Sequence, residues 1–383
     1  MNRLPVTLVG GFLGAGKTSL LHHFISEHQG GHLAVLVENP GALNLDAKAL
    51  RGLGGAMRRT NDAVFEIPNG DEAAQVQAVA GCLRDLAEAG RYERVLIEVA
   101  GTSSPAWLAR HFGLVPGQPE TFSHWAELQQ IVCVVDALDY FRLGKPEPSE
   151  PHAMWDFQNE QIAGASLIVL NKCDLIEAKE REVCAKWLES INRDAWVIEA
   201  AFGEVPPHIL LDLATTQKLA RVVERRPERK GAGIPGPELA SALYRVHRPF
   251  HPQRFWDWFN ADHPSLLRAK GIVWLATRNL LVGGVSRTRW QNSCGVAGIW
   301  WAALPREEWP QEPEALRRMQ ETWREPYGDR RQELILIGEA EPLSTTMRRE
   351  LDACLLTDEE FSRPLKEWAA LPDPFPAWDF EDE

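Results

Sequence analysis

The sequence lacks the features that mark a disulfide framework, a nucleic-acid surface or a membrane span. Its six cysteines include no Cys-x-x-Cys pair, a pattern typical of reduced thiols in a cytosol. Positive charge is scarce, because 41 Lys and Arg against 54 Asp and Glu give a formal net charge of −13, whereas a nucleic-acid surface is cationic. The longest apolar stretch, Gly271 to Val285, is interrupted by Arg278. We therefore expect a cytoplasmic protein that binds neither nucleic acid nor membrane.

The first half of the chain alternates short β-rich runs with helical patterns. This alternation is typical of βαβ units and predicts an α/β fold with a mostly parallel sheet. The expected strands are Pro5–Val9, Leu33–Val37, Val64–Ile67, Arg94–Glu98, Gln130–Val135, Leu167–Leu170 and Trp196–Glu199. The expected helices include Lys17–Glu27, Glu72–Ala89 and Glu177–Ile191.

Changes in composition divide the chain into domains. A segment that is first basic and then rich in glycine and proline, 221–240, predicts a linker after a first domain of residues 1–220. The tryptophan-rich residues 241–362 predict a smaller α+β domain, in which we expect most tryptophans to pack in the core. The acidic, proline-rich residues 363–383 predict a disordered tail.

The strongest motif is Gly11–Thr18 (GFLGAGKT), which fits G-x-x-x-x-G-K-[ST] between an expected strand and an expected helix. Its glycines let several backbone N–H groups point at one phosphate, and the helix N-terminus adds its dipole. Lys17 would reach the β- and γ-phosphates, and the Thr18 hydroxyl would ligate Mg²⁺. We expect nucleotide contacts from Gly11, Gly14, Ala15, Gly16, Lys17, Thr18 and Ser19.

A second motif favours GTP over ATP. Asn171, Lys172 and Asp174 form N-K-x-D directly after an expected buried strand. In the P-loop GTPases, whose N-K-x-D run this segment resembles, an Asp here pairs with guanine N1 and N2, whereas adenine offers no matching donors and would leave the carboxylate unpaired. Asn171 and Lys172 would support the base and its loop.

Two further expected strands end in carboxylates. Glu98 would stand near Mg²⁺, and Gly101 just beyond it could donate its N–H to the γ-phosphate; the alternative is that Glu98 is a solvated strand end. Asp136 could equally cap the following helix or contact a ligand. We take Lys17, Glu98 and Glu38 as the catalytic candidates, and we assign no residue to the attacking water.

These motifs resemble those of the CobW-type GTPases, relatives of the nickel-insertion proteins UreG and HypB. The similar segments are Gly10–Thr18 (GGFLGAGKT), Ile97–Gly101 (IEVAG) and Asn171–Asp174 (NKCD). The C-terminal half resembles the same family, especially its zinc-homeostasis branch, in Arg248–Phe255, Leu267–Gly271, Gly328–Leu334 and Leu351–Thr357. The resemblance covers about residues 5 to 362. It implies a P-loop fold of the SIMIBI type and slow GTP hydrolysis coupled to delivering a metal to a client protein.

The chain departs from that family at the metal motif. The family carries C-x-C-C directly after an Asn-Gly turn, but here Asn69-Gly70 is followed by Asp71-Glu72-Ala73-Ala74, without a thiol. A soft site for zinc or cobalt has therefore lost its ligands. The family's switch segment, E-N-E-F-G-E, is shortened here to Glu38–Ala42, in which Glu38 survives, and Asp46 matches a family carboxylate.

Asp71 and Glu72 allow two interpretations. They could form a hard-oxygen cargo site for Mg²⁺, Mn²⁺ or Fe²⁺. The preferred interpretation is that they are ordinary acids of a first helical turn, which favour the positive end of the helix dipole. Histidines elsewhere, such as His22-His23 and His247 with His251, are weaker ligand candidates.

Three functions remain open from the sequence. The first is a GTPase that delivers an unidentified transition metal to a client metalloprotein or apo-enzyme, with a modified cargo site. The second is a GTP-dependent protein switch that carries no metal, because the C-x-C-C site is absent. The third, a P-loop kinase for a small molecule, is disfavoured by the N-K-x-D run, because that motif selects guanine.

Overall fold

The computed structural model describes residues 3–27, 32–38, 63–67, 72–114, 121–144, 153–211, 239–310 and 313–378. The chain divides into two compact units, Met1–Glu238 and Leu239–Glu383, and the boundary falls within the range predicted as a linker. None of the helices in the described ranges is long and apolar enough to cross a bilayer.

The first unit is built on a seven-stranded sheet in the order β3-β2-β4-β1-β5-β6-β7. All neighbouring strands pair in parallel, which confirms the predicted α/β class. The strands β2 and β6 are buried at every residue, as expected for a parallel sheet covered on both faces. The strands are β1 (Leu4–Gly11), β2 (Leu33–Glu38), β3 (Ala63–Ile67), β4 (Arg94–Glu98), β5 (Ala126–Asp136), β6 (Leu167–Asn171) and β7 (Trp196–Glu199).

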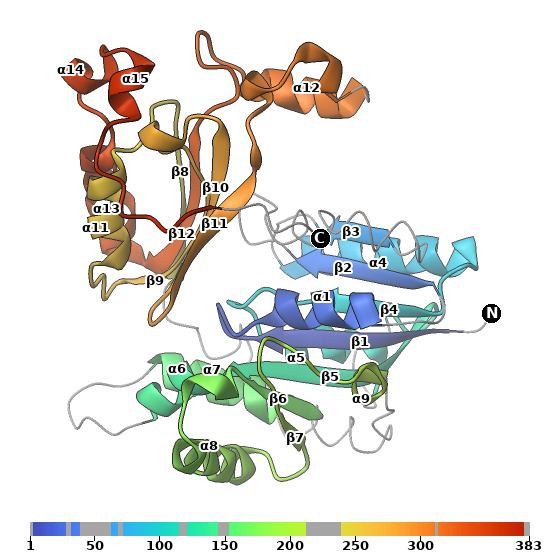
Figure 1. Ribbon diagram of the computed structural model, residues 1–383. Coiled ribbons are helices and arrows are strands. Elements are labelled where there is room, and N and C mark those ends of the chain that lie inside the picture. Colours follow the sequence, from blue (N-terminus) through green and yellow to red (C-terminus); the bar gives the residue numbers. More distant parts are fainter. Residues whose placement is uncertain are drawn as a thin grey trace. The chain divides into compact units, whose positions relative to one another are not determined.

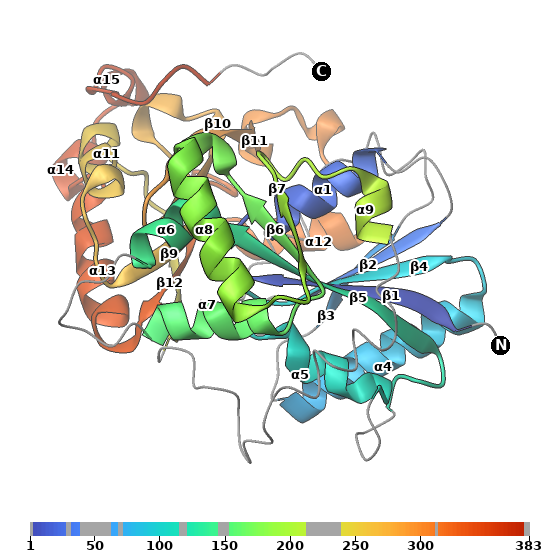
Figure 2. The same cartoon turned by 90° about the horizontal axis from the view of Figure 1, so that it is seen from below.

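Helices cover both faces of this sheet (Figure 2). One face carries α1 (Lys17–Glu27) and α9 (Pro207–Leu211), whose apolar residues pack with β1 and β2. The other face carries α4 (Glu72–Ala89) and α5 (Pro105–Ala109). Three more helices pack against β5 and β6, namely α6 (Ala137–Leu143), α7 (Ala153–Ala163) and α8 (Ala178–Ile191). Short 3₁₀ turns follow at Arg110–Phe112 and Cys173–Leu175.

The strand order reverses direction at β1, which lies between β4 and β5. In open parallel sheets, ligands bind beyond the carboxyl ends of the strands at such a switch point. The loop between β1 and α1 lies there, the loops after β4 and β6 leave the same edge of the sheet, and β2 ends at that edge with Glu38. The fold therefore brings the predicted motifs of the first unit to one edge.

The second unit is a five-stranded antiparallel sheet in the order β11-β10-β9-β12-β8. Two helices, α11 (Pro252–Asn260) and α13 (Ala340–Cys354), lie side by side against one face of it (Figure 1). This confirms an α+β second domain. Its strands are β8 (Leu239–Val246), β9 (Leu266–Val273), β10 (Leu281–Thr288), β11 (Asn292–Ile299) and β12 (Gln332–Glu339), and its other helices are α12 (Pro313–Thr322), α14 (Asp358–Phe361) and α15 (Leu365–Trp368), with 3₁₀ turns at Ala276–Arg278, Trp301–Ala303 and Arg306–Glu308.

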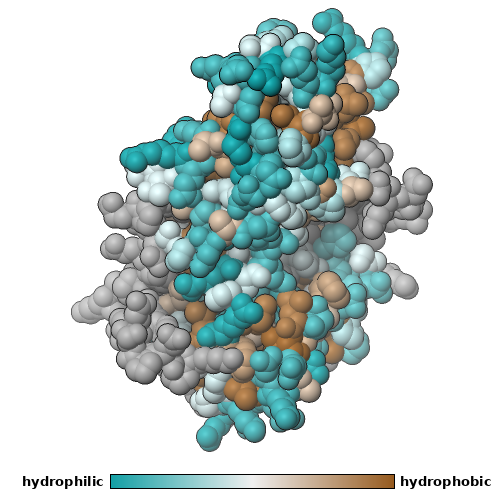
Figure 3. Space-filling view, turned by 60° about the vertical axis from the view of Figure 1, so that its left-hand side comes forward, coloured by the Kyte–Doolittle hydropathy of each residue, from teal (hydrophilic) through white to brown (hydrophobic). Residues whose placement is uncertain are grey.

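Several tryptophans of the second unit pack in its interior. Trp258, Trp274, Trp300 and Trp368 are all buried, so core packing is confirmed for them. Trp274 and Trp368 belong to one apolar cluster, and Trp258 belongs to another beneath α11 and α13. The face of the molecule drawn in Figure 3 is mostly hydrophilic, with apolar side chains in small groups.

The prediction of a disordered tail from residue 363 onward is wrong for the part that the structure describes, 363–378. Trp368 is buried at the end of α15, and Phe375 and Trp378 are buried beyond it. Asp373 forms an ion pair with Arg278, whose Nε lies 2.8 Å from its Oδ2. Proline and acidic residues dominate the composition, but the aromatic residues between them anchor the segment.

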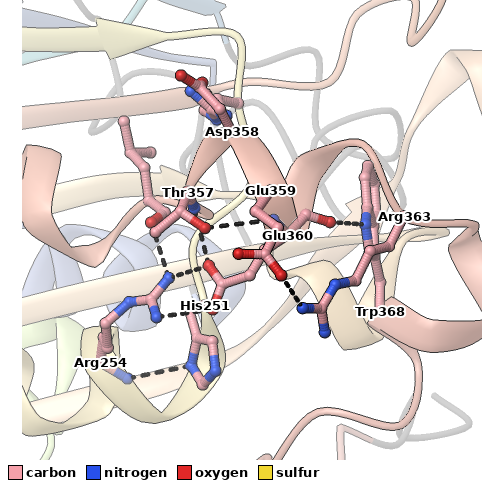
Figure 4. A network of polar contacts seen from close by, with 10 residues as sticks. His251, Arg254, Thr357, Asp358, Glu359, Glu360, Arg363 and Trp368 are labelled. Carbon is pink, nitrogen blue, oxygen red and sulfur yellow. Dashed lines mark hydrogen bonds and ion pairs between the residues drawn. The ribbon is translucent and has the colours of Figure 1, made fainter.

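A polar network holds the turn before α14 against α11 (Figure 4). Arg254 donates from Nη1 and Nη2 to the two oxygens of Glu360, at 3.0 and 2.6 Å. Thr357 and Glu360 form a reciprocal capping box at the start of α14. The pKa of Glu360 is lowered to about 2, first by the hydrogen bond from Arg254. Arg254 therefore holds α14 against α11.

Candidate nucleotide-binding site

The phosphate loop leaves β1 in a conformation that only glycine accepts. Gly11 has φ +134°, and a Cβ there would lie 2.1 Å from the carbonyl oxygen of Val134. Gly16 has φ +101°, and a Cβ there would lie 2.3 Å from the Asn171 amide nitrogen. These two positions need glycine because the loop passes close to β5 and to the loop after β6. The backbone amides of Gly14 to Ser19 lie in this loop and the start of α1.

Lys17 is the first residue of α1 and is buried. Its Nζ donates to the carbonyl oxygens of Gly11, at 2.9 Å, and Phe12, at 3.3 Å. The side chain thus folds back over the loop, and the charge lies where the loop would hold a phosphate. The N-terminus of α1 adds its partial positive charge at the same place.

The side chains of Thr18 and Glu98 contact each other. Glu98 ends β4 and is buried, so the alternative of a solvated strand end is wrong. The Thr18 hydroxyl donates to Glu98 Oε1 at 3.1 Å. A hydroxyl and a carboxylate oxygen together form the hard-oxygen donor set that Mg²⁺ prefers. The residues present therefore fit a magnesium ion.

Glu38 is held from two sides at the end of β2. Its Oε2 accepts the Ala100 backbone N–H at 3.0 Å, and its Oε1 accepts the Gln75 side-chain amide of α4 at 2.9 Å. Burial raises the pKa of Glu38, and the bonds from Ala100 and Gln75 offset this in part. Gly101 packs directly on the phosphate loop, since a Cβ there would lie 2.8 Å from Leu13 N.

Asn171 joins the two halves of the site. Its Nδ2 donates to the Ala15 carbonyl of the phosphate loop at 2.9 Å. Its Oδ1 accepts the backbone N–H of Gly203 at 3.0 Å. One buried amide therefore ties the phosphate loop, the N-K-x-D loop and the loop after β7 together.

The remaining members of N-K-x-D face different surroundings. Lys172 adopts a left-handed backbone with φ +62°, and its Nζ lies 2.6 Å from Asp136 Oδ2. Asp136 also accepts the backbone N–H groups of Leu138 and Asp139, so it caps α6. Asp174 is exposed, and its role in reading a base stays a prediction.

Sequence reasoning missed Gln75 and Gly203. Gln75 gave no signal, because a glutamine in the first turns of a helix is ordinary. Gly203 could have been noticed as a glycine just after a strand, at a position where a Cβ would lie 2.7 Å from Leu20 N.

Part of the predicted site falls outside the described residues. Asp71 and the segment 39–62, with Asp46, are not among them, and Glu72 is the first residue of α4. The cargo and capping interpretations of Asp71 and Glu72 thus stay predictions. In the ranges that the structure describes, no group of three or more His, Cys, Asp or Glu side chains could hold a metal ion.

The parallel sheet, the phosphate loop and the N-K-x-D loop define a P-loop nucleotide-binding protein of the guanine-specific class. Residues 5–199 match the CobW/HypB/UreG nucleotide-binding domain, and residues 239–355 match the cobalamin synthesis protein CobW C-terminal domain. The chain therefore belongs to the CobW/HypB/UreG family.

The chain is similar to proteins from eukaryotes and bacteria, over different shares of its length. The chain is 28% identical to the zinc-regulated GTPase metalloprotein activator 1 of Dictyostelium discoideum, over 97% of this chain and 84% of that protein. It is 30% identical to the zinc chaperone CobW of Pseudomonas aeruginosa, over 57% of this chain and 62% of that protein. The crystal structure of Zn(II)-bound YjiA GTPase from Escherichia coli is 18% identical, with a TM-score of 0.40 over 93% of this chain and 100% of YjiA.

Proposed function

We propose that this protein binds and hydrolyses GTP and couples the hydrolysis to metal delivery or to activation of a client metalloprotein in the cytoplasm. The observation that carries the GTP assignment is the Asn171 amide, which joins a phosphate loop to an N-K-x-D loop. The family membership and the names of the relatives support the metal-related role.

The residues of the site divide the work of hydrolysis. Thr18 and Glu98 would hold Mg²⁺, which supplies charge neutralisation for the phosphates when bound. The positive charge of Lys17 would lie beside the transferred phosphoryl group. The backbone amides of the phosphate loop would donate hydrogen bonds to the phosphate oxygens. Gly101 N–H lies in the loop after β4, from which it would contact the γ-phosphate.

We assign Glu38 a positioning role. Both of its oxygens are engaged, one with the Ala100 N–H and one with Gln75. It fixes the peptide that leads to Gly101 and so acts on the phosphate through the backbone. This differs from the catalytic role that the sequence suggested.

The base assignment is tested with Asp174→Asn. The asparagine presents a donor where guanine needs an acceptor, so the variant should lose its preference for GTP over xanthosine triphosphate while keeping its fold. Binding is measured by calorimetry for both nucleotides, with Lys17→Ala as a control that weakens both. If Asp174→Asn binds GTP as the unaltered protein does, Asp174 does not read the base.

The metal role is tested by equilibrium binding. The purified chain is equilibrated with Zn²⁺, Co²⁺, Mn²⁺ or Fe²⁺, with and without a non-hydrolysable GTP analogue, and bound metal is measured. Stoichiometric binding that responds to the analogue supports metal delivery. Its absence would favour the second function, a GTP-dependent switch without cargo, which the missing C-x-C-C motif also permits. A variant with Asp71 and Glu72 both changed to Ala tests whether these acids are ligands.

A further inference from the structure

Two residues other than glycine have left-handed backbones in the described part of the chain. They are Lys172, with φ +62°, and Phe202, with φ +54°. Such a backbone costs free energy for a residue with a Cβ, and it is retained most often at functional sites. Lys172 lies in the N-K-x-D loop after β6, and Phe202 lies in the loop after β7, the neighbouring strand. The two strained positions therefore belong to adjacent loops at the same edge of the sheet.

Hydrogen bonds fix these two loops to each other. The Cys173 N–H donates to the Ala200 carbonyl at 3.0 Å, and the Gly203 N–H donates to Asn171 Oδ1 at 3.0 Å. Gly203 also packs against the backbone of α1 at Leu20. Phe202 thus lies between two anchored residues, and its strained backbone has a fixed place beside the base-reading loop.

The Phe202 side chain is exposed despite this fixed backbone. It is 72% exposed, compared with 61% for Trp196 and 60% for Leu280, the next most exposed large apolar residues of the described ranges. Leaving most of a phenyl ring in water forgoes the favourable burial of its apolar surface. A strained backbone that holds an aromatic ring in water is explained if a ligand covers the ring.

We propose that Phe202 stacks on the guanine base, forming an apolar wall of the base pocket whose edge is read by Asp174. This rests on the proposed GTP binding. A planar base is favoured over a protein surface as the occupant, because Phe202 is fixed through Gly203 to Asn171, the residue that ties the base loop to the phosphate loop. The flat π-face of a purine matches an aromatic ring, and stacking does not depend on the edge of the base.

Stacking and edge reading have different consequences for binding. Loss of Asp174 changes the preference between bases, whereas loss of the Phe202 ring weakens all purine nucleotides by a similar factor. We expect Phe202→Gly to weaken GDP binding about tenfold and to leave the ratio of GDP to xanthosine diphosphate affinity unchanged. Phe202→Trp restores the ring and should bind GDP within about twofold of the unaltered protein.

The experiment is calorimetric titration of the full chain with GDP and with xanthosine diphosphate. Phe202→Gly is the main variant, because glycine accepts the left-handed backbone without strain, and Phe202→Ala is a second ring deletion. Trp196→Ala, an exposed aromatic residue at the opposite end of β7, is the matched control and should leave GDP affinity unchanged. Melting temperatures verify that each variant is folded.

The outcomes separate this proposal from the proposed function. If the unaltered protein binds GDP and folded Phe202→Gly binds it equally well, the stacking proposal is overturned. If Phe202→Gly keeps its GDP affinity but activates a client less well, the Phe202 ring contacts a protein partner, and the stacking proposal is overturned as well. If the unaltered protein binds no guanine nucleotide, the proposed function itself fails.

Discussion

Glu38 in the first unit and Glu333 in the second are both buried, at 8% and 2% exposed, but their partners differ. Glu38 accepts hydrogen bonds from a backbone N–H and a neutral amide, and burial raises its pKa. Burial also acts on Glu333 and would raise its pKa, but the charges and hydrogen bonds of Arg331 and Arg245 outweigh it, so the pKa is lowered. Similar burial therefore gives opposite shifts, and the partners decide the sign.

The difference lies in the partners of the individual carboxylates. Three carboxylates of the second unit are paired with arginines, in Arg245–Glu333, Arg254–Glu360 and Arg278–Asp373. In the first unit, neutral groups hold Glu38 near the edge where a nucleotide would bind, and the charge is not cancelled by them. A carboxylate paired with arginine keeps a lowered pKa, whereas burial among neutral donors raises the pKa of Glu38, so the two kinds of group respond oppositely to pH.

The largest expected effect is on Glu333. Glu333→Ala leaves the half-buried Arg245 and the more deeply buried Arg331 without their carboxylate, so we expect the free energy of unfolding to fall by about 3 kcal/mol. Urea unfolding followed by tryptophan fluorescence measures it, because Trp274 and Trp300 are buried in the same unit. GDP affinity should not change. An unaltered urea midpoint would contradict the stabilising role of Glu333. A loss of GDP binding in the folded variant would contradict the expectation that Glu333 does not affect the nucleotide site.

A smaller effect is expected for Glu360, through pH. Its pKa in the folded chain, about 2, is below the ordinary value of 4.5, so the unfolded chain takes up the proton first. Stability from this group is complete above about pH 4.5 and is lost as pH falls toward 2, by about 2 kcal/mol in all. We expect Glu360→Gln to be less stable at pH 7 and to lack this acid-dependent loss.

The control for this prediction is Glu359→Gln. Glu359 pairs with Arg363 at 2.6 Å, but its side chain is 82% exposed, so a smaller effect than that of Glu360→Gln is expected. Both variants are unfolded with urea at pH 5 and pH 3. Equal acid dependence of Glu360→Gln and the unaltered chain would mean that the network of Figure 4 does not hold α14 in solution.

A pH effect of the opposite sign is expected at Glu38. Because its pKa is raised, the folded chain binds more protons than the unfolded chain above pH 4.5, and stability falls as pH rises through the raised pKa. Glu38→Gln removes this pH dependence of the free energy of unfolding. It should also slow GTP hydrolysis by about tenfold, since an amide has one acceptor oxygen to hold Ala100 and Gln75.

Gln75→Ala serves as the partner variant for Glu38. It removes one hydrogen bond to the carboxylate and leaves the bond from Ala100. Hydrolysis should slow less than in Glu38→Gln, with GDP affinity unchanged in both. If Glu38→Gln hydrolyses GTP at the unaltered rate, Glu38 has no positioning role in hydrolysis.

Much of the first unit could be predicted because its signals are local. The helices Lys17–Glu27 and Glu72–Ala89 and the strand Arg94–Glu98 begin and end where the sequence places them. A buried parallel strand is a continuous apolar run, and the phosphate loop has fixed glycine spacing. Such patterns need no knowledge of distant residues.

Contacts between distant segments could not be predicted. Glu38 and Gln75 are 37 residues apart, and Arg278 and Asp373 are 95 apart, so no periodicity links them. The folded tail was missed for the same reason, because Phe375 and Trp378 find their partners on Arg278 and the core of the second unit. Amino-acid composition records the many prolines and acidic residues of the tail, but it contains no information about which residues the aromatic side chains contact.

In the proposed site, Asn171 would also favour a ligand of a particular length. Its amide bonds the phosphate loop through Ala15 and the loop after β7 through Gly203, so the two ends of the site keep a constant separation. A nucleoside without phosphates can occupy the base end alone, and inorganic phosphate the other end alone. A nucleotide that reaches both the base end and the phosphate end would make both sets of contacts. It would lose translational freedom once, whereas a separate nucleoside and phosphate would each lose it. In the proposed site, the span of the ligand would therefore contribute to selection together with its chemical identity.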